Sequence, residues 1–298
     1  MRPARFGPAG GRRLGRLLVV AAVILGSVPA WSADCDRPVA DASRIAVAGG
    51  SITEILYALG EQQRIVAVDA TSNYPEDAAR FPSVGYVRNL SAEGLLSMAP
   101  TLILGEHDMG PDVVLEQIAG VGVNVVRVPE EFSAAGIARK VMCVGTVIGR
   151  RAAAQRYVDT ELQPVIDRLA DLRPQGDAPR VAVLLSISEG APLAAGVATS
   201  GNGLLRMAGA VNVFEGFDGW KPVSLEHMTV AAPDLILVPD RGAAAAGGVT
   251  SLLDEPGIRM TPAGRARRVA VLDGMAMLGF GPRTLTSALE LAERLHQP

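Results

Sequence analysis

Several residue types that build metal and catalytic sites are scarce in this chain of 298 residues. It contains two cysteines, three histidines and 4% aromatic residues. A structural zinc site needs four cysteine or histidine ligands, so this composition argues against a dedicated Cys/His zinc cluster. The formal net charge is −3, and the sequence has no basic face of the kind that binds nucleic acid. We therefore look for function in other residues.

The chain begins with a segment typical of secretory signal peptides. Five arginines precede an apolar run at Leu17–Leu25, and small residues with candidate cleavage sites after Ala30 and Ala33 follow. The run is too short for a stable membrane-spanning helix. We predict that residues 1–33 are removed, which leaves 265 residues with a net charge of −8 in the periplasm.

The two cysteines, Cys35 and Cys143, both lie in the predicted mature chain. Export to an oxidising compartment permits a disulfide between them. Two unpaired buried thiols fit the sequence equally well. Both alternatives stay open at this point.

Short apolar runs alternate with longer amphipathic ones, a pattern that predicts α/β architecture with mainly parallel sheets. We expect two Rossmann-like lobes, at residues 34–149 and 174–298, joined by a long helix over 150–173 with Pro164 kinking it. A ligand cleft would lie between the lobes. The predicted strands are Arg44–Ala48, Ile65–Val68, Leu102–Leu104, Val123–Val128, Arg180–Leu185, Leu235–Val238 and Val269–Leu272. The clearest predicted helices are Thr53–Leu59, Ala92–Met98 and Leu285–Leu295.

An internal repeat supports two similarly built lobes. The segment Leu90–Leu104 is echoed by Val223–Leu237, with an offset of 133 residues throughout. Each copy predicts a serine N-cap, a short helix that ends before a proline, and a buried strand. The offset pairs Glu93 with Glu226.

A glycine turn follows the first predicted strand. Gly49, Gly50 and Ser51, with Asp69 about twenty residues later, partly resemble a dinucleotide site. The full G-x-G-x-x-G pattern is missing, because Ile52, Thr53 and Glu54 occupy its later positions. We prefer a tight strand-to-helix turn that lines the cleft. No Ser/His/Asp or Cys/His grouping and no Gly-x-Ser-x-Gly motif is apparent, so we predict that the chain is not an enzyme.

Three motifs carry a resemblance to a known family. They are Ala48-Gly-Gly-Ser-Ile-Thr-Glu54, Val84-Gly-Tyr-Val-Arg-Asn-Leu-Ser-Ala-Glu-Gly-Leu-Leu96 and Leu278-Gly-Phe-Gly-Pro-Arg-Thr284. Together they resemble haem-binding proteins of bacterial haem-uptake ABC transporters. These belong to the helix-linked class of periplasmic binding proteins, which also includes ferric-siderophore and corrinoid binders. The resemblance implies that the ligand is haem, Fe(III) protoporphyrin IX; a siderophore or a corrinoid is the alternative.

The resemblance assigns the iron ligand to Tyr86. Ferric iron prefers an anionic oxygen donor, and phenolate is an established haem ligand. A phenol with an ordinary pKa near ~10 needs a nearby cation to ionise at neutral pH. Arg88, which would project to the same side of an extended segment, and Arg241, which we expect in a loop of the second lobe, are the candidates to stabilise the phenolate or bind a propionate. Phe280 is expected to line the cleft.

Histidine ligation is not expected. The region Ser186–Gly196, where some relatives supply a second axial histidine, contains none. His107 and His227 lie elsewhere, and a surface position is expected for His227. We predict five-coordinate iron, bound by tyrosine alone.

The resemblance also implies partners. One surface glutamate of each lobe, Glu93 and Glu226, would dock onto arginines of a dimeric permease that works with a cytoplasmic ATPase. The competing interpretation is a helix-capping acid, although the Ser-to-Glu spacing is one residue shorter than a capping box requires. We expect a monomer.

Overall fold

The computed structural model describes residues 35–174, 176–188 and 191–296. The predicted signal peptide lies outside the described residues. Across the described ranges, no helix is both long and apolar enough to span a membrane.

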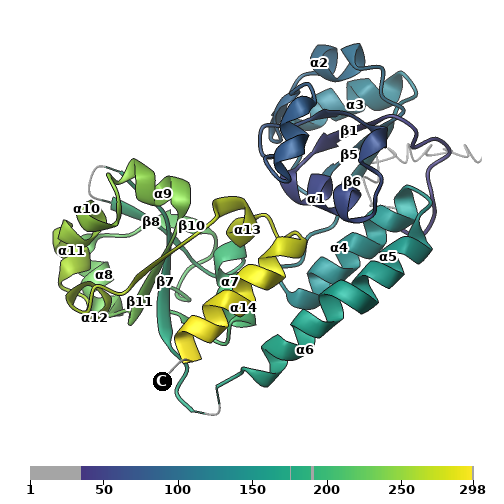
Figure 1. Ribbon diagram of the computed structural model, residues 1–298. Helices are drawn as coiled ribbons and strands as arrows, with labels where there is room; N and C mark the ends of the chain where they lie inside the picture. Colours follow the sequence, from purple (N-terminus) through teal and green to yellow (C-terminus); the bar gives the residue numbers. More distant parts are fainter. Residues whose placement is uncertain (1–34, 175, 189–190, 297–298) are drawn as a thin grey trace, which may run out of the picture. The chain divides into compact units, whose positions relative to one another are not determined.

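The first half of the fold is built on a four-stranded sheet in the order β2-β1-β5-β6 (Figure 1). All its strand pairs are parallel, and Ile45 of β1 pairs with both Ile65 of β2 and Leu102 of β5. Every residue of β1 is buried, as expected for a central parallel strand covered on both faces. The elements are β1 (Ile45–Ala48), α1 (Gly50–Ala58), the 3₁₀ turn η1 (Gln62–Arg64), β2 (Ile65–Val68), the 3₁₀ turn η2 (Glu76–Arg80), β3 (Gly85–Tyr86), β4 (Asn89–Leu90), α2 (Ala92–Ser97), β5 (Leu102–Glu106), α3 (Asp112–Gly120) and β6 (Asn124–Val128).

A helical segment connects the halves. It comprises α4 (Ala134–Val147), α5 (Arg151–Tyr157), a π-helical turn labelled η3 (Val158–Leu162) and α6 (Gln163–Asp171). The predicted helix is present from Arg151 onward, but it is not uniform. Proline has no N–H to donate to the carbonyl four residues earlier, and the π turn lies directly before Pro164. A change of helix type therefore occurs next to Pro164, where the sequence predicted a kink.

The second half contains a mixed sheet in the order β10-β8-β7-β11-β12, with β9 pairing to β7. Strands β7, β9, β11 and β12 pair in parallel, whereas β8 and β10 pair antiparallel. The elements are β7 (Arg180–Ser188), β8 (Ala191–Ala195), α7 (Ser200–Met207), β9 (Val211–Asn212), β10 (Trp220–Pro222), α8 (Leu225–Ala231), β11 (Leu235–Pro239), α9 (Asp240–Ala245), α10 (Val249–Asp254), α11 (Pro256–Arg259), α12 (Pro262–Arg265), β12 (Val269–Leu272), α13 (Gly274–Leu278) and α14 (Pro282–His296).

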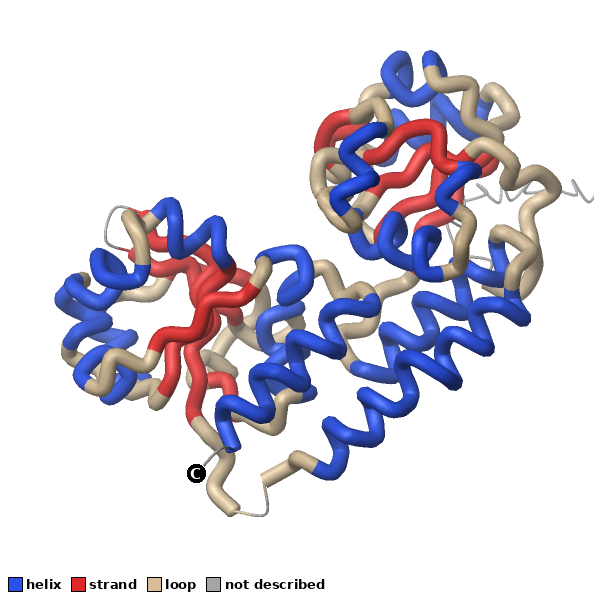
Figure 2. Tube along the Cα trace, in the orientation of Figure 1, coloured by secondary structure: helices blue, strands red, loops and turns tan. Residues whose placement is uncertain are grey.

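The chain is therefore an α/β protein with two central, mainly parallel sheets and a helical connection (Figure 2). One continuous hydrophobic cluster joins the first sheet, helices α4 to α6, helix α14 and one face of the second sheet. A second cluster covers the other face of the second sheet. Because the halves share a core, the boundaries at residues 149 and 173 stay a prediction.

The internal repeat corresponds to equivalent structure. Ser91 caps α2 and Ser224 caps α8, and each side chain accepts a hydrogen bond from the backbone N–H three residues later. Ala99 and Ala232, which precede the two prolines, both adopt left-handed backbone conformations, with φ of 46° and 45°. The strands that follow, β5 and β11, are central in their sheets. The repeat is thus confirmed as a structural duplication.

Candidate functional site

Tyr86 and Arg88 lie in a small antiparallel hairpin formed by β3 and β4. The segment turns at Val87 and Arg88, so it is not continuously extended as the sequence suggested. The two side chains nevertheless meet, and Arg88 Nη1 donates a hydrogen bond of 2.5 Å to the Tyr86 hydroxyl. Tyr86 is 45% exposed, which is high for a large ring and does not suit a packing role.

Arg88 also pairs with Asp108, in the loop after β5. Arg88 Nε and Nη2 lie 2.7 Å and 2.5 Å from Asp108 Oδ2. Partial burial acts to lower the pKa of Arg88, but the charges and hydrogen bonds of Asp108 and Tyr86 raise it. Arg88 therefore stays cationic beside the Tyr86 hydroxyl.

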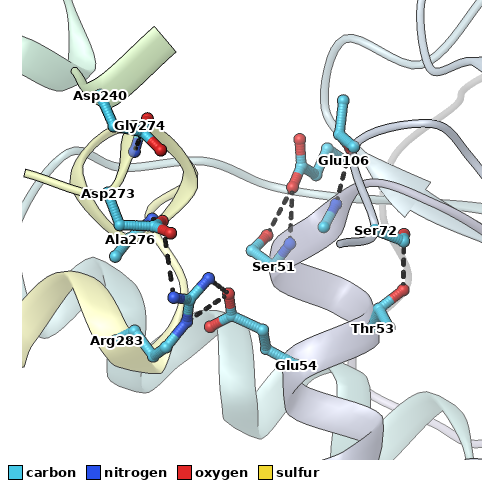
Figure 3. A network of polar contacts seen from close by, with 12 residues as sticks. Ser51, Thr53, Glu54, Ser72, Glu106, Asp240, Asp273, Gly274, Ala276 and Arg283 are labelled. Carbon is cyan, nitrogen blue, oxygen red and sulfur yellow. Dashed lines mark hydrogen bonds and ion pairs between the residues drawn. The ribbon is translucent and has the colours of Figure 1, made fainter. Parts of the chain in front are cut away.

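The glycine turn after β1 is built around Glu106. Gly49 has φ of 134°, and a Cβ there would lie 2.4 Å from Glu106 Cγ, so only glycine fits. The backbone N–H and the hydroxyl of Ser51 both donate to Glu106 Oε1 (Figure 3). Desolvation raises the pKa of Glu106, while Lys140 and Ser51 act to lower it.

The Asp69 carboxylate stabilises the glycine turn through hydrogen bonds. Its carboxylate accepts hydrogen bonds from the backbone of Gly49 and Thr71 and from the hydroxyls of Thr71 and Ser72. It is 2% exposed. A dinucleotide site needs this acid free for a ribose hydroxyl, so the geometry speaks against that alternative.

One buried hydrogen bond and one ion pair link the halves next to the glycine turn. Lys140 of α4 is 1% exposed; it lies 2.5 Å from Glu130 Oε2 and donates to the carbonyl of Phe280 at 2.9 Å. Arg283 of α14 donates to Glu54 of α1 at 2.8 Å and 3.0 Å (Figure 3). Burial raises the pKa of Glu130 to about 7, although Lys140 acts to lower it.

The predicted cleft-lining residues are mostly interior. Ser51 and Phe280 are 1% and 0% exposed, and Gly49 and Gly50 are also buried. Phe280 packs edge-on against Phe132 at a centroid distance of 5.0 Å. Phe280 belongs to the buried core in this structure, and its place in the cleft stays a prediction.

Arg241 belongs to the short helix α9, whereas the sequence suggested a loop. It is exposed and lines a cavity of about 200 Å³ at the carboxyl ends of β11 and β12, which Asn73 of the first half also lines. No hydrogen bond or ion pair of its side chain occurs among the described residues, so the structure does not bring it into contact with Tyr86.

The two histidines occupy different surroundings. His107 lies between Glu106 and Asp108 and packs edge-on against Phe132. Desolvation lowers its pKa, although Asp108 acts to raise it. His227 is exposed on α8 and contacts the Phe214 ring, which agrees with the expected surface position.

The remaining predicted residues are the two glutamates and the two cysteines. Glu93 and Glu226 are both exposed, one at the second position of α2 and the other at the second position of α8. The serines cap these helices without a reciprocal bond from either glutamate among the described contacts. Cys35 and Cys143 form a disulfide with a Cα–Cα distance of 4.7 Å.

The sequence interpretation missed four charged residues of the site and its support: Asp108, Glu106, Glu130 and Lys140. Asp108 comes 20 residues after Arg88, and Lys140 comes 89 residues after Ser51. No local spacing rule connects such pairs. The one available signal was the position of Glu106 and Asp108 just after a predicted buried strand, where α/β proteins place functional side chains.

Comparisons with known proteins agree with this architecture. The family model described as periplasmic binding protein matches residues 45–276. Among solved structures, the chain is similar to the periplasmic heme-binding protein BhuT in complex with two hemes, at 40% identity and a TM-score of 0.79, covering 85% of this chain and 97% of that one. It is also similar to the heme-binding protein HutB of Vibrio cholerae, at 32% identity and a TM-score of 0.79, covering 86% and 100%. A curated relative, the vitamin B12-binding protein of Pectobacterium carotovorum subsp. carotovorum (strain PC1), is 26% identical over 63% of this chain and 69% of its own length.

Proposed function

The chain belongs to the periplasmic binding protein family, and on that premise we propose that it captures haem in the periplasm and delivers it to an ABC importer. The family is one of binding proteins that serve transport. The heme-binding titles of the similar structures support haem as the ligand. The vitamin B12-binding relative supports a corrinoid as the second candidate.

The pairing of Tyr86 with Arg88 is the observation that carries the haem proposal. An exposed phenol whose oxygen accepts a bond from a guanidinium is prepared to become a phenolate, and phenolate is a hard donor suited to ferric iron. Haem iron has axial positions open to a protein ligand. A hexadentate ferric siderophore, or a corrinoid that carries both axial ligands, has no open position and requires no tyrosine from the protein.

The other groups are assigned by their positions. Arg88 stabilises the phenolate, and Arg241, which has a free side chain among the described contacts, neutralises a propionate or adds to that stabilisation. His107 and His227 are left without an iron-binding role, so the iron is five-coordinate. Gly49, Gly50 and Ser51 shape the turn beneath the ligand.

The partners follow from the same function. We assign Glu93 and Glu226 to docking on a permease dimer that works with a cytoplasmic ATPase, and the relative from Bacillus subtilis (strain 168) described as an ABC transporter substrate-binding lipoprotein supports such a partnership. Residues 1–33 act as the signal peptide, and the mature protein is a monomer.

Titration of the protein lacking residues 1–33 with haemin tests the proposal. We expect a saturable Soret change and a phenolate-to-iron charge-transfer band. Tyr86→Phe should remove that band and weaken binding at least as much as the ten- to hundredfold loss typical of a lost supporting contact at a metal site. Tyr57→Phe is the matched control, because Tyr57 bonds to Asp77 outside the site.

Saturable binding of cyanocobalamin but not haemin would favour the corrinoid alternative. An unchanged ferric spectrum in Tyr86→Phe would contradict the assignment of Tyr86 as the iron ligand.

A further inference from the structure

The guanidinium of Arg88 is held from two sides. Nη1 donates to the Tyr86 hydroxyl, while Nε donates to Oδ2 of Asp108 and Nη2 lies 2.5 Å from the same oxygen. A planar guanidinium has a fixed fork of donors, so contacts at two of its edges fix its orientation. Arg88 is 60% exposed and Asp108 only 23%, which makes the carboxylate the better-anchored partner.

The loop that carries Asp108 is fastened to the hairpin that carries Tyr86. The N–H of Gly110 donates to the carbonyl of Val87 at 2.9 Å, and the N–H of Leu90 donates to the carbonyl of Gly110 at 2.8 Å. Arg127 also donates to the carbonyl of Met109 at 2.7 Å. The loop and the hairpin thus form one unit, and Asp108 has a defined position relative to Tyr86.

Asp108 interacts with one hydrogen-bond donor among the described residues. Among the described contacts Arg88 is its donor, and its second oxygen, Oδ1, is buried without a partner. Glu106 and His107 both interact electrostatically with Asp108, and Arg127 contacts Met109 and Asp112. The contact with Arg88 is therefore the hydrogen-bonded interaction of this carboxylate among the described residues.

A second tyrosine in the chain shows the opposite order of groups. The Tyr57 hydroxyl donates directly to Asp77, and Arg80 lies behind that carboxylate. Burial first, and then Asp77, raise the pKa of Tyr57 to about 12. At Tyr86 the cation contacts the phenol and the carboxylate stands behind it. The two tyrosines thus have a carboxylate and an arginine nearby in opposite order.

We propose that Asp108 is a positioning residue that holds the Arg88 guanidinium against the Tyr86 hydroxyl, so that the cation is in place before the ligand arrives. The inference rests on the proposed function for its purpose, but its geometry belongs to the ligand-free protein. Without Asp108, the flexible Arg88 side chain samples many rotamers, and ordering it costs free energy when the ligand binds.

The first test needs no haem. In ¹⁵N-labelled protein, the Nε–H signal of Arg88, identified by its absence in Arg88→Lys, should exchange slowly with solvent. Asp108→Ala should speed that exchange at least tenfold, whereas Asp108→Asn, which keeps an acceptor oxygen, should retain most of the protection. Asp77→Ala is the matched control and should leave the signal unchanged. An identical exchange rate in Asp108→Ala overturns the proposal, whether or not the protein binds haemin.

The second test is a double-mutant cycle with haemin. Asp108→Ala should weaken binding about tenfold and shift the charge-transfer band, as expected for loss of a charged hydrogen bond. In the Arg88→Ala background the same change should cause no further loss, because Asp108 acts through Arg88. Equal losses in both backgrounds would contradict the positioning role. If the parent shows no haemin binding, the proposed function fails and the exchange experiment alone decides on Asp108.

Discussion

At the scale of single residues, the two arginines assigned to the ligand differ in how the protein holds them. Arg88 is fixed between Tyr86 and Asp108, whereas Arg241 is exposed, and its side chain makes no bond among the described contacts. A preorganised cation acts on the phenol before binding, and a free one is ordered only by the ligand. We therefore expect Arg88 to govern ionisation and Arg241 to contribute mainly to propionate binding.

This difference predicts distinct pH profiles of haemin affinity. A cation next to the phenol favours the phenolate, so its loss means that the phenolate forms only at higher pH. Arg88→Ala should weaken binding at pH 6 to 7 more than at pH 9. Arg241→Ala should weaken it more evenly across that range. Spectroscopic titrations at a series of pH values would measure both profiles.

Lysine variants are the controls for these profiles. Lysine keeps the charge but loses the planar fork, so Arg88→Lys should restore part of the pH profile and little of the paired geometry with Asp108. Far-UV circular dichroism of the ligand-free variants should match the parent. If both alanine variants bind haemin like the parent at every pH, the two assignments are wrong.

At the scale of helices and strands, the sequence predicted the elements whose signal is local. The seven predicted strands correspond to β1, β2, β5, β6, β7, β11 and β12, because buried parallel strands are continuous apolar runs. The strands β3, β4, β8, β9 and β10 were missed. All except the five-residue strand β8 have two or three residues, so they are defined by their pairing partners and not by their own composition.

At the candidate site, too, the sequence predicted only the residues whose signal is local. Tyr86 and Arg88 stand two residues apart, so a local motif contained both. Their support comes from remote positions: Asp108 lies 20 residues from Arg88, and Glu54 lies 229 residues from Arg283. Only the folded chain brings such pairs together, which is why the motif that contains Glu54 and the motif that contains Arg283 were found but their contact was not.

The buried contact between Glu130 and Lys140 of α4 predicts a pH dependence of stability. Burial raises the pKa of Glu130 to about 7 from an ordinary value of 4.5, so the folded protein holds a proton that the unfolded chain releases. The resulting stability is complete below pH 4.5 and is lost as the pH rises to about 7. The loss is at most about 3 kcal/mol.

Glu130→Gln should remove this dependence, because a neutral amide does not titrate. Urea unfolding at pH 5 and at pH 8 would give the free energy of unfolding of both proteins. We expect the parent to lose more stability than Glu130→Gln between these values. Glu131→Gln is the control, since Glu131 is exposed and pairs with Arg139 at the surface. An equal loss in parent and Glu130→Gln would show that Glu130 is ionised throughout.

At the scale of the whole molecule, the duplicated halves place equivalent acids at equivalent positions. Glu93 and Glu226 are exposed at the second position of α2 and α8, in helices with matching serine caps and matching left-handed alanines at their ends. The caps account for the serines and leave the glutamates without a structural partner among the described contacts. This repeated position suits both glutamates to contact another protein that presents two equivalent surfaces.

A permease dimer presents two equivalent surfaces, so two equivalent acids can engage both at once. Charge pairs at such a rim guide encounter and register, and salt weakens them. Glu93→Arg combined with Glu226→Arg should therefore abolish haem uptake by cells or by reconstituted transporter, while haemin affinity in solution stays near the parent value. Each single reversal should act less strongly, because one half of the contact remains. If the double variant transports normally, or if it loses haemin binding, the acids serve their own helices and not the permease.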